Sequence, residues 1–76
     1  MKLKKLENII DNCAHVRIWS DEETDEPVFS GYFMDIPWWV MDCPLDIGGD
    51  AEPIEFTTDV NEYNNTIPIV IIYIKV

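Results

Sequence analysis

Closely spaced carboxylates are the residues of this sequence whose type and spacing could do chemistry. Five of them stand within residues 21–26, and Asp50 and Glu52 form a further pair. On an extended strand, side chains at i and i+2 lie roughly 6.5 to 7 Å apart, close to the spacing of phosphates along a nucleic-acid strand. The pairs of this kind are Asp21/Glu23, Glu23/Asp25 and Asp50/Glu52. The spacing predicts a surface that mimics nucleic acid and binds a protein whose Lys and Arg side chains grip phosphates.

The same acidic segment offers a second chemistry, the binding of a hard cation. Asp21, Glu23 and Asp25 stand at positions one, three and five of a calcium-binding loop. The pattern then fails, because Glu26 replaces the required Gly and Tyr32 stands where a bidentate Glu should be. We therefore expect no specific metal site and no cofactor.

No arrangement typical of an enzyme is present in the sequence. His15 is the only histidine, and no nucleophile motif surrounds a Ser or Cys. Paired carboxylates could act as acid and base only if one of them lay in an apolar cleft, and these are expected to be exposed. The sequence predicts a protein that is not an enzyme.

Cysteine usage and the N-terminal residues bear on location. Cys13 and Cys43 are widely separated and have no second pair, which predicts two free, packed thiols rather than a redox or zinc site. Residues 1–6 look like the start of a signal peptide, but Glu7 and Asp11 interrupt any apolar region. These features predict a cytoplasmic protein.

The charge balance is strongly acidic. Fifteen Asp and Glu oppose five Lys and Arg, giving a net charge of −10. Solubility alone asks for a magnitude of only about 2 to 8 in a small domain. No Lys or Arg stands between Ser20 and Ile74, so we expect the whole surface formed by this stretch to be negative. Direct binding of DNA or RNA is therefore disfavoured. Two interpretations stay open: the charge serves solubility, or it forms a binding surface.

Hydrophobic periodicity predicts the elements that must position these acids. Spacings of three and four residues predict an N-terminal helix over residues 2–12 with one apolar stripe, made of Leu3, Leu6, Ile9, Ile10 and Cys13. Alternation predicts strands over 14–19, 28–36 and 54–60, the last of them half-buried and followed by an Asn-rich turn over 61–65. Pro37 begins a short helix through Asp42. The expected fold class is α+β: one domain, residues 1–76, with a small antiparallel β-sheet of about four strands and both helices covering one face.

The last strand, expected from Pro68 to Val76, is apolar on both faces. It should therefore lie at the centre of the sheet or at a dimer seam. In the second case Ile69, Ile71 and Tyr73, within residues 69–73, would line the seam of a homodimer. A small structural or assembly protein that oligomerises in this way is the alternative function.

Trp38 and Trp39 leave two interpretations open. Neighbouring positions on a helix point about 100° apart. Either both side chains close a thin core, or one of them, for which we take Trp39, is an exposed anchor for a protein partner.

Three stretches of sequence carry a resemblance to known proteins. They are Val16-Arg17-Ile18-Trp19, Val28-Phe29-Ser30-Gly31-Tyr32 and Asp35-Ile36-Pro37-Trp38-Trp39, followed by an Ile-rich final strand. With these the chain resembles small uncharacterised proteins encoded in phages and mobile elements of Gram-positive bacteria. The resemblance implies a compact αββαββ-like domain without assigned catalytic residues. In its size and acidity the chain is also similar to anti-CRISPR-type inhibitors, many of which are acidic binders of nucleic-acid-handling complexes.

The leading hypothesis is a non-catalytic, phage-type inhibitor that covers the nucleic-acid-binding surface of a basic host protein or complex. It involves no membrane and no direct contact with nucleic acid. The predicted partner-binding residues are Asp21, Glu22, Glu23, Asp25, Glu26, Asp46, Asp50, Glu52, Glu55, Asp59 and Trp39.

Overall fold

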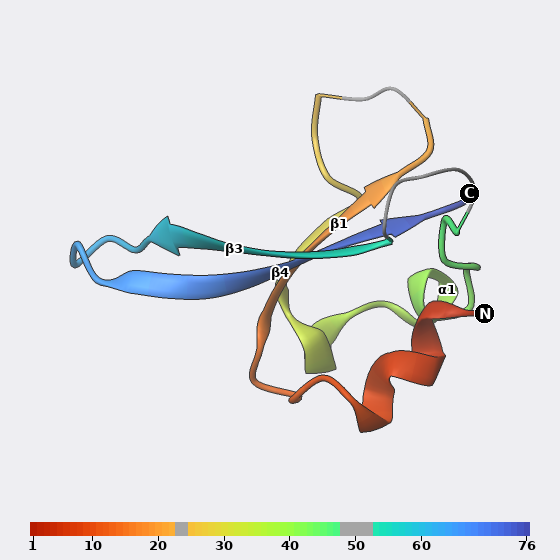
Figure 1. The fold of residues 1–76 in the computed structure, drawn as a ribbon, viewed down its shortest axis with the longest axis horizontal. Helices are drawn as coiled ribbons and strands as arrows, with labels where there is room; N and C mark the ends of the chain where they lie inside the picture. Colours follow the sequence, from red (N-terminus) through yellow and green to blue (C-terminus); the bar gives the residue numbers. More distant parts are fainter. Residues whose placement is uncertain (23–24, 48–52) are drawn as a thin grey trace.

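A four-stranded sheet forms the frame of the protein. The computed structural model describes residues 1–22, 25–47 and 53–76. The strands are β1 (His15–Ser20), β2 (Phe29–Tyr32), β3 (Ile54–Val60) and β4 (Thr66–Ile74). They lie in the order β2-β1-β4-β3 (Figure 1). The α+β class, the four strands and the central position of the last strand are confirmed.

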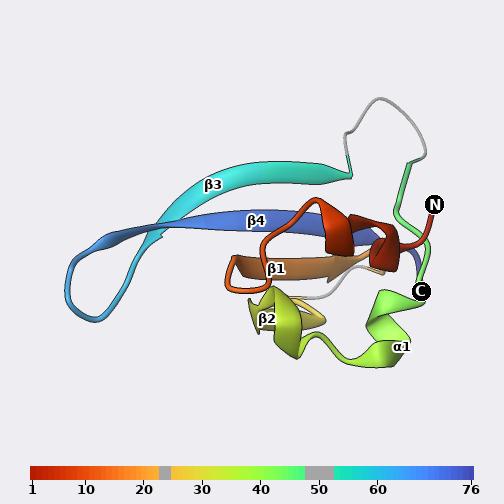
Figure 2. The ribbon, with the colours of Figure 1, turned by 90° about the horizontal axis from the view of Figure 1, so that it is seen from below.

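The sheet is mixed, whereas we expected it to be wholly antiparallel. β1 and β2 form one antiparallel hairpin and β3 and β4 form another, but β1 and β4 pair in parallel, with His15 beside Ile69 and Ser20 beside Ile74. Parallel neighbours require a long crossover between them. Residues 33–47, which follow the first hairpin, belong to this crossover and pass along one face of the sheet (Figure 2).

Helical cover of one face is as expected, but the described residues form three short helices there where we expected two. They are the 3-10 helices η1 (Leu3–Asn8) and η2 (Phe33–Asp35) and the α-helix α1 (Trp38–Met41). In Figure 1 all of them lie below the sheet. α1 starts after Pro37, as the fixed φ of proline favours.

The N-terminal helix is shorter and more tightly wound than the predicted α-helix over 2–12. A 3-10 helix has three residues per turn, so Leu3 and Leu6 lie on the same side, where both are buried. The helix ends at Asn8, and Ile9, at 77% exposure, lies outside the core. The prediction that Ile9 and Cys13 continue the buried stripe is therefore wrong, since Cys13 is exposed as well.

The core lies between the helices and the sheet. Val16 and Ile18 of β1 point into it, as their alternation predicted, and meet Ile72 of β4 and Val40 of α1. The strand predicted over 28–36 is correct only for its first half, because the chain turns into η2 after Tyr32. The η2 turn buries Phe33 in the same core.

The β3–β4 hairpin projects beyond the helical layer (Figures 1 and 2). Its turn lies where the Asn-rich segment predicted it: the Asn61 side chain accepts the N–H groups of Tyr63 and Asn65, and Asn64 has a φ of 61°. We expected β3 to be half-buried, but Phe56 is 82% exposed, because no described helix reaches beneath it. Among the described residues, no helix is long and apolar enough to cross a membrane.

Candidate functional site

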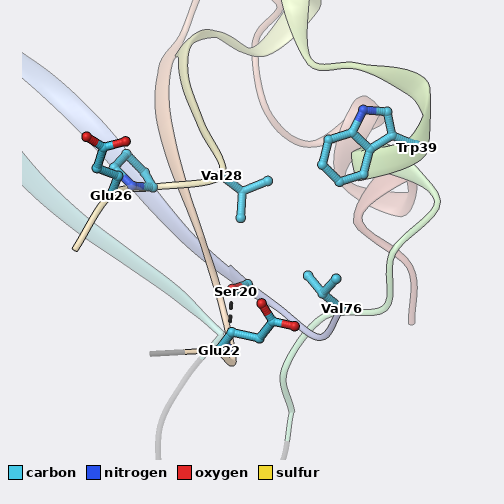
Figure 3. Close-up of a pocket in the computed structure, with 7 residues that line it drawn as sticks. Ser20, Glu22, Glu26, Val28, Trp39 and Val76 are labelled. Carbon is cyan, nitrogen blue, oxygen red and sulfur yellow. Dashed lines mark hydrogen bonds between the residues drawn. The ribbon is translucent and has the colours of Figure 1, made fainter. Parts of the chain in front are cut away.

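A groove of about 390 Å³ runs between the β1–β2 loop, helix α1 and the last residue of the chain. Figure 3 shows Val28 between Trp39 and Glu26, with Glu22 near Val76. Three predicted partner-binding residues, Glu22, Glu26 and Trp39, thus meet in one groove although they come from separate elements. We call these three residues with Val28 and Val76 the acidic groove.

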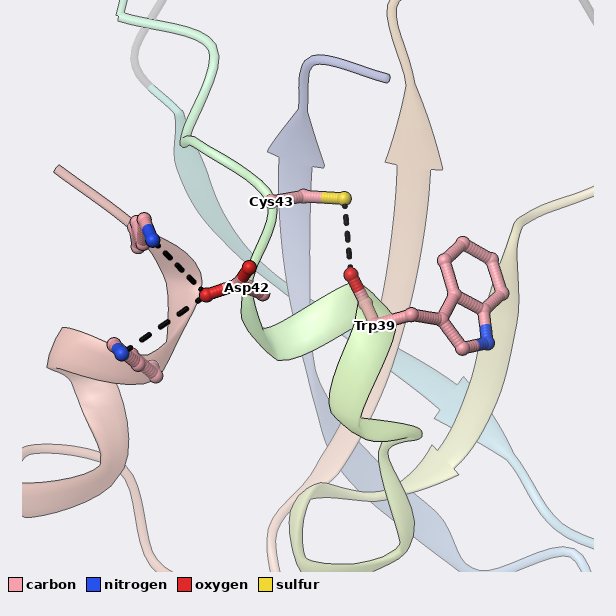
Figure 4. Close-up of polar contacts among 5 residues, drawn as sticks. Trp39, Asp42 and Cys43 are labelled. Atoms are coloured by element: carbon pink, nitrogen blue, oxygen red, sulfur yellow. Dashed lines mark hydrogen bonds and ion pairs between the residues drawn. The ribbon is translucent and has the colours of Figure 1, made fainter.

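Helix α1 leaves the Trp39 side chain partly exposed. Val40 is the residue of this helix that enters the core completely, whereas Trp38 is 80% and Trp39 47% exposed. The interpretation in which both tryptophans close the core is therefore wrong. The Trp39 carbonyl oxygen is also fixed, since the Cys43 thiol donates a hydrogen bond to it at 3.2 Å (Figure 4).

Two hydrogen bonds position the start of the β1–β2 loop. The Ser20 hydroxyl oxygen accepts the N–H of Glu22 at 3.2 Å, which is the local turn that Ser residues favour after a strand. The Asp21 carboxylate accepts the N–H of Val76 at 3.0 Å. The loop is thereby tied to the chain that follows β4, and this contact brings Val76 into the groove.

Basic residues neutralise acids elsewhere on the protein. The Lys2 and Lys4 ammonium groups lie 3.0 and 3.9 Å from the same Asp42 carboxylate oxygen (Figure 4), and Lys75 lies 4.0 Å from Asp46. The hydrogen bond and charge of Lys2 lower the pKa of Asp42 below its usual value. The expectation that the whole surface from residue 20 to 74 is uniformly negative is thus wrong, because bases from outside this stretch reach into it.

The remaining predicted site residues do not join the groove. Glu55 and Asp59 lie on β3, where Glu55 accepts a hydrogen bond from Tyr73 and Asp59 pairs with Arg17. Asp46 is held by Lys75. Asp25 lies exposed in the β1–β2 loop. Glu23, Asp50 and Glu52 lie outside the described residues, and with them all the acid pairs at i and i+2 on which the spacing argument depended.

The face of the sheet opposite the helices carries a second group of polar and aromatic residues. His15 and Tyr32 lie in contact there, with ring centroids 4.6 Å apart. Neighbouring positions on this face hold Arg17, Ile71 and Tyr73. His15 is therefore half-buried beside an aromatic ring, and no Ser or Cys hydroxyl or thiol is hydrogen-bonded to it among the described residues.

The thiols are free, as predicted, but only one of them is packed. Cys43 is half-buried against the core, whereas Cys13 is exposed. In the described part of the chain, no group of three or more His, Cys, Asp or Glu side chains is placed to hold a metal ion.

The groove combines an apolar wall with carboxylates, which suits a long basic side chain. The stem of a Lys or Arg packs on apolar surface while its charged end meets the acids, and a guanidinium or ammonium can also lie over an indole face. Sequence reasoning missed Val28 and Val76, because a single Val beside polar residues carries no distinctive pattern. Their role depends on the tertiary contact between Asp21 and Val76.

Comparisons with known proteins add no relationship: no family model matches the chain, and no curated protein or solved structure is significantly similar to it.

Proposed function

We propose that this protein is a non-catalytic inhibitor that binds a basic, nucleic-acid-binding surface of another protein through the acidic groove. The observation that carries the proposal is the convergence of Trp39, Glu22 and Glu26 on one groove. Exposed Trp is the residue type most often found at the energetic centre of protein interfaces. Carboxylates around it add selectivity for Lys and Arg and accelerate encounter with a basic partner.

Charge favours a partner that normally holds phosphates. The chain has a net charge of −10, and four of its five basic residues are already engaged with acids at a distance from the groove or on the sheet. A protein surface rich in Lys and Arg is attracted to such a molecule at a rate that falls with salt. Occupation of that surface would exclude nucleic acid, which is the proposed inhibitory effect. Since such partners handle nucleic acid inside cells, the proposed location is the cytoplasm.

The test uses two double variants that change the net charge equally. Glu22→Lys/Glu26→Lys alters the groove, and Asp35→Lys/Glu62→Lys alters exposed acids elsewhere. Wild type and both variants are immobilised and exposed to a bacterial lysate, and retained proteins are released first by rising salt and then by competing DNA or RNA. We expect one nucleic-acid-binding protein to be retained by wild type and by the control, to be lost with the groove variant, and to be displaced by nucleic acid.

The tryptophans provide a second matched pair. Trp39→Ala should weaken retention of that protein by about tenfold or more, the usual effect of removing an interface Trp, whereas Trp38→Ala should change it little. Equal retention by the groove variant, or a partner that nucleic acid does not displace, would contradict the proposal.

The alternative function is assembly into a homodimer through residues 69–73, and little of that surface is exposed. Ile69 is only 6% exposed, and Ile71 and Tyr73 are half-buried on the sheet face opposite the helices. The homodimer through this face stays a prediction, which light scattering of an Ile71→Lys variant would test.

A further inference from the structure

β3 forms one edge of the sheet, and its outer side is unpaired in the described structure. It is seven residues long and contains neither Pro nor Lys, two of the devices by which proteins usually protect an edge strand. It also presents Phe56 almost completely to solvent. A long edge with an exposed aromatic side chain is a template for pairing with another strand.

The hydrogen bonds of the β3–β4 ladder show which backbone groups are available. The Pro53 carbonyl accepts the N–H of Tyr73 at 2.8 Å, and the N–H of Asn61 donates to Asn65 at 3.0 Å at the other end of the ladder. Bonded and non-bonded pairs alternate in an antiparallel ladder. The even-numbered residues between these ends, Ile54, Phe56, Thr58 and Val60, therefore direct their N–H and C=O groups outward.

One of these outward groups is already satisfied. The N–H of Val60 donates to the Asp59 carboxylate at 2.8 Å. The N–H groups that remain available in the described structure are those of Ile54, Phe56 and Thr58, a set that is symmetric about Phe56. Symmetry of this kind fits a second copy of the same strand running in the opposite direction.

Charge selects the register of such a pairing. A two-fold axis at Phe56 sets Phe56 against its own copy, Ile54 against the copy's Thr58, and Glu55 against the copy's Thr57. An axis one position further, at Thr57, would set Glu55 against the copy's Asp59, a repulsive pair of like charges. An axis at Thr58 would require the N–H of Val60, which Asp59 holds. The register centred on Phe56 avoids both costs.

We infer that two copies of this chain associate through antiparallel pairing of their β3 edges about a two-fold axis at Phe56, which makes one continuous eight-stranded sheet. The projection of the β3–β4 hairpin beyond the helices leaves this edge accessible (Figure 2). The two Phe56 side chains meet on the helix-bearing face of the sheet, at the part of β3 that the described helices do not reach. Without the dimer, each of these side chains is exposed to water. This dimer does not depend on the proposed function of the acidic groove.

Sedimentation equilibrium at low and high salt is the first measurement. Two chains with a net charge of −10 each repel one another, so the dimer should become tighter as salt screens that repulsion. Binding of a basic partner to the acidic groove should instead weaken with salt. The opposite salt dependences allow one proposal to fail while the other stands.

A charge exchange at the axis tests the register. Phe56→Glu and Phe56→Lys each set two like charges opposite one another, and each should raise the dissociation constant of the dimer by about tenfold or more. An equimolar mixture of the two variants should restore association, detected by native mass spectrometry as a mixed dimer. Tyr63→Glu, an exposed aromatic in the turn of the same hairpin, is the matched control and should dimerise like wild type.

A second variant tests whether backbone hydrogen bonds from β3 hold the dimer together. Thr58→Pro removes an outward N–H without removing a bond to β4, and it should also abolish the dimer while circular dichroism stays that of wild type. A wild-type chain that remains monomeric at every concentration and salt, variants that dimerise unchanged, or a mixture that does not recover association would each overturn the inference.

Discussion

Arg17 of β1 and Asp59 of β3 form an ion pair, with 3.1 Å between Nη2 and Oδ2, although β4 lies between their strands. Arg17 is paired in the sheet with Ile71 and Asp59 with Ile67. The ion pair therefore crosses over Ile69, which lies between them on the same face. This explains why Ile69 is almost completely buried on a face that none of the described helices covers.

The first prediction concerns the pH dependence that Asp59 contributes to stability. Hydrogen bonds from the Val60 N–H and from Arg17 lower the pKa of Asp59 below its usual value of 3.8. A lowered pKa means that the folded state favours the carboxylate, so the stabilisation is fully present above pH 3.8 and is lost as the pH falls through the folded-state pKa. Asp59→Asn should therefore lose stability less steeply than wild type below pH 3.8.

Urea unfolding at a series of pH values checks this, with Glu62→Gln as the control at an exposed carboxylate in the neighbouring turn. Parallel pH profiles for wild type and Asp59→Asn would contradict the prediction.

A second prediction separates two isoleucines that the sequence places in apolar stripes. Ile72 is completely buried at the centre of the sheet, and Ile72→Ala should lower the free energy of unfolding by about 2–5 kcal/mol. Ile9 lies beyond the end of η1, and Ile9→Ala should change it by no more than about 0.5 kcal/mol. Chemical denaturation measures both, and a large loss from Ile9→Ala would mean that the N-terminal helix extends further than Asn8.

A third prediction concerns Gly31 in β2. Its φ is +154°, and a Cβ placed there would lie 3.2 Å from the tip of the Phe29 ring. Gly31→Ala therefore combines backbone strain with a close contact in the core, and should destabilise the protein by about 1–3 kcal/mol. Ser30→Ala, at the exposed neighbouring position, should stay within about 0.5 kcal/mol of wild type in the same denaturation experiment.

The fourth prediction concerns the titration of Tyr73. Burial, followed by the negative charge of Glu55 and its hydrogen bond at 3.4 Å, raises the pKa of Tyr73 above 10.0. Glu55→Gln should lower this pKa part of the way toward 10.0, because burial remains. Ultraviolet absorbance titration, with Tyr73→Phe used to identify the signal, checks the result. A titration curve unchanged by Glu55→Gln would show that Glu55 does not act on the phenol.

Local patterns in the sequence predicted the elements whose neighbours in the chain decide their structure. The alternation of Val16 and Ile18 gave the correct buried face of β1, and Pro37 marked the start of α1. The apolar character of both faces of β4 correctly placed it at the centre of the sheet. In each case the relevant information lies within a few residues.

Features that depend on distant contacts were not predictable in this way. The alternation of β3 predicted a buried side for Phe56, but burial requires a helix beneath it, and the helical layer ends before that point. The parallel pairing of β1 with β4 depends on the path of the crossover rather than on the composition of either strand. For the candidate site, the acids and Trp39 were identified, whereas their convergence with Val28 and Val76 was not.

The parallel pairing of β1 with β4 also has a consequence for the order in which the chain acquires its structure. The two central strands are separated by most of the sequence, and contacts between distant segments slow folding because the intervening loop must close first. Because β4 is the last strand in the sequence and lies between β1 and β3, the complete sheet can form only after translation has reached β4.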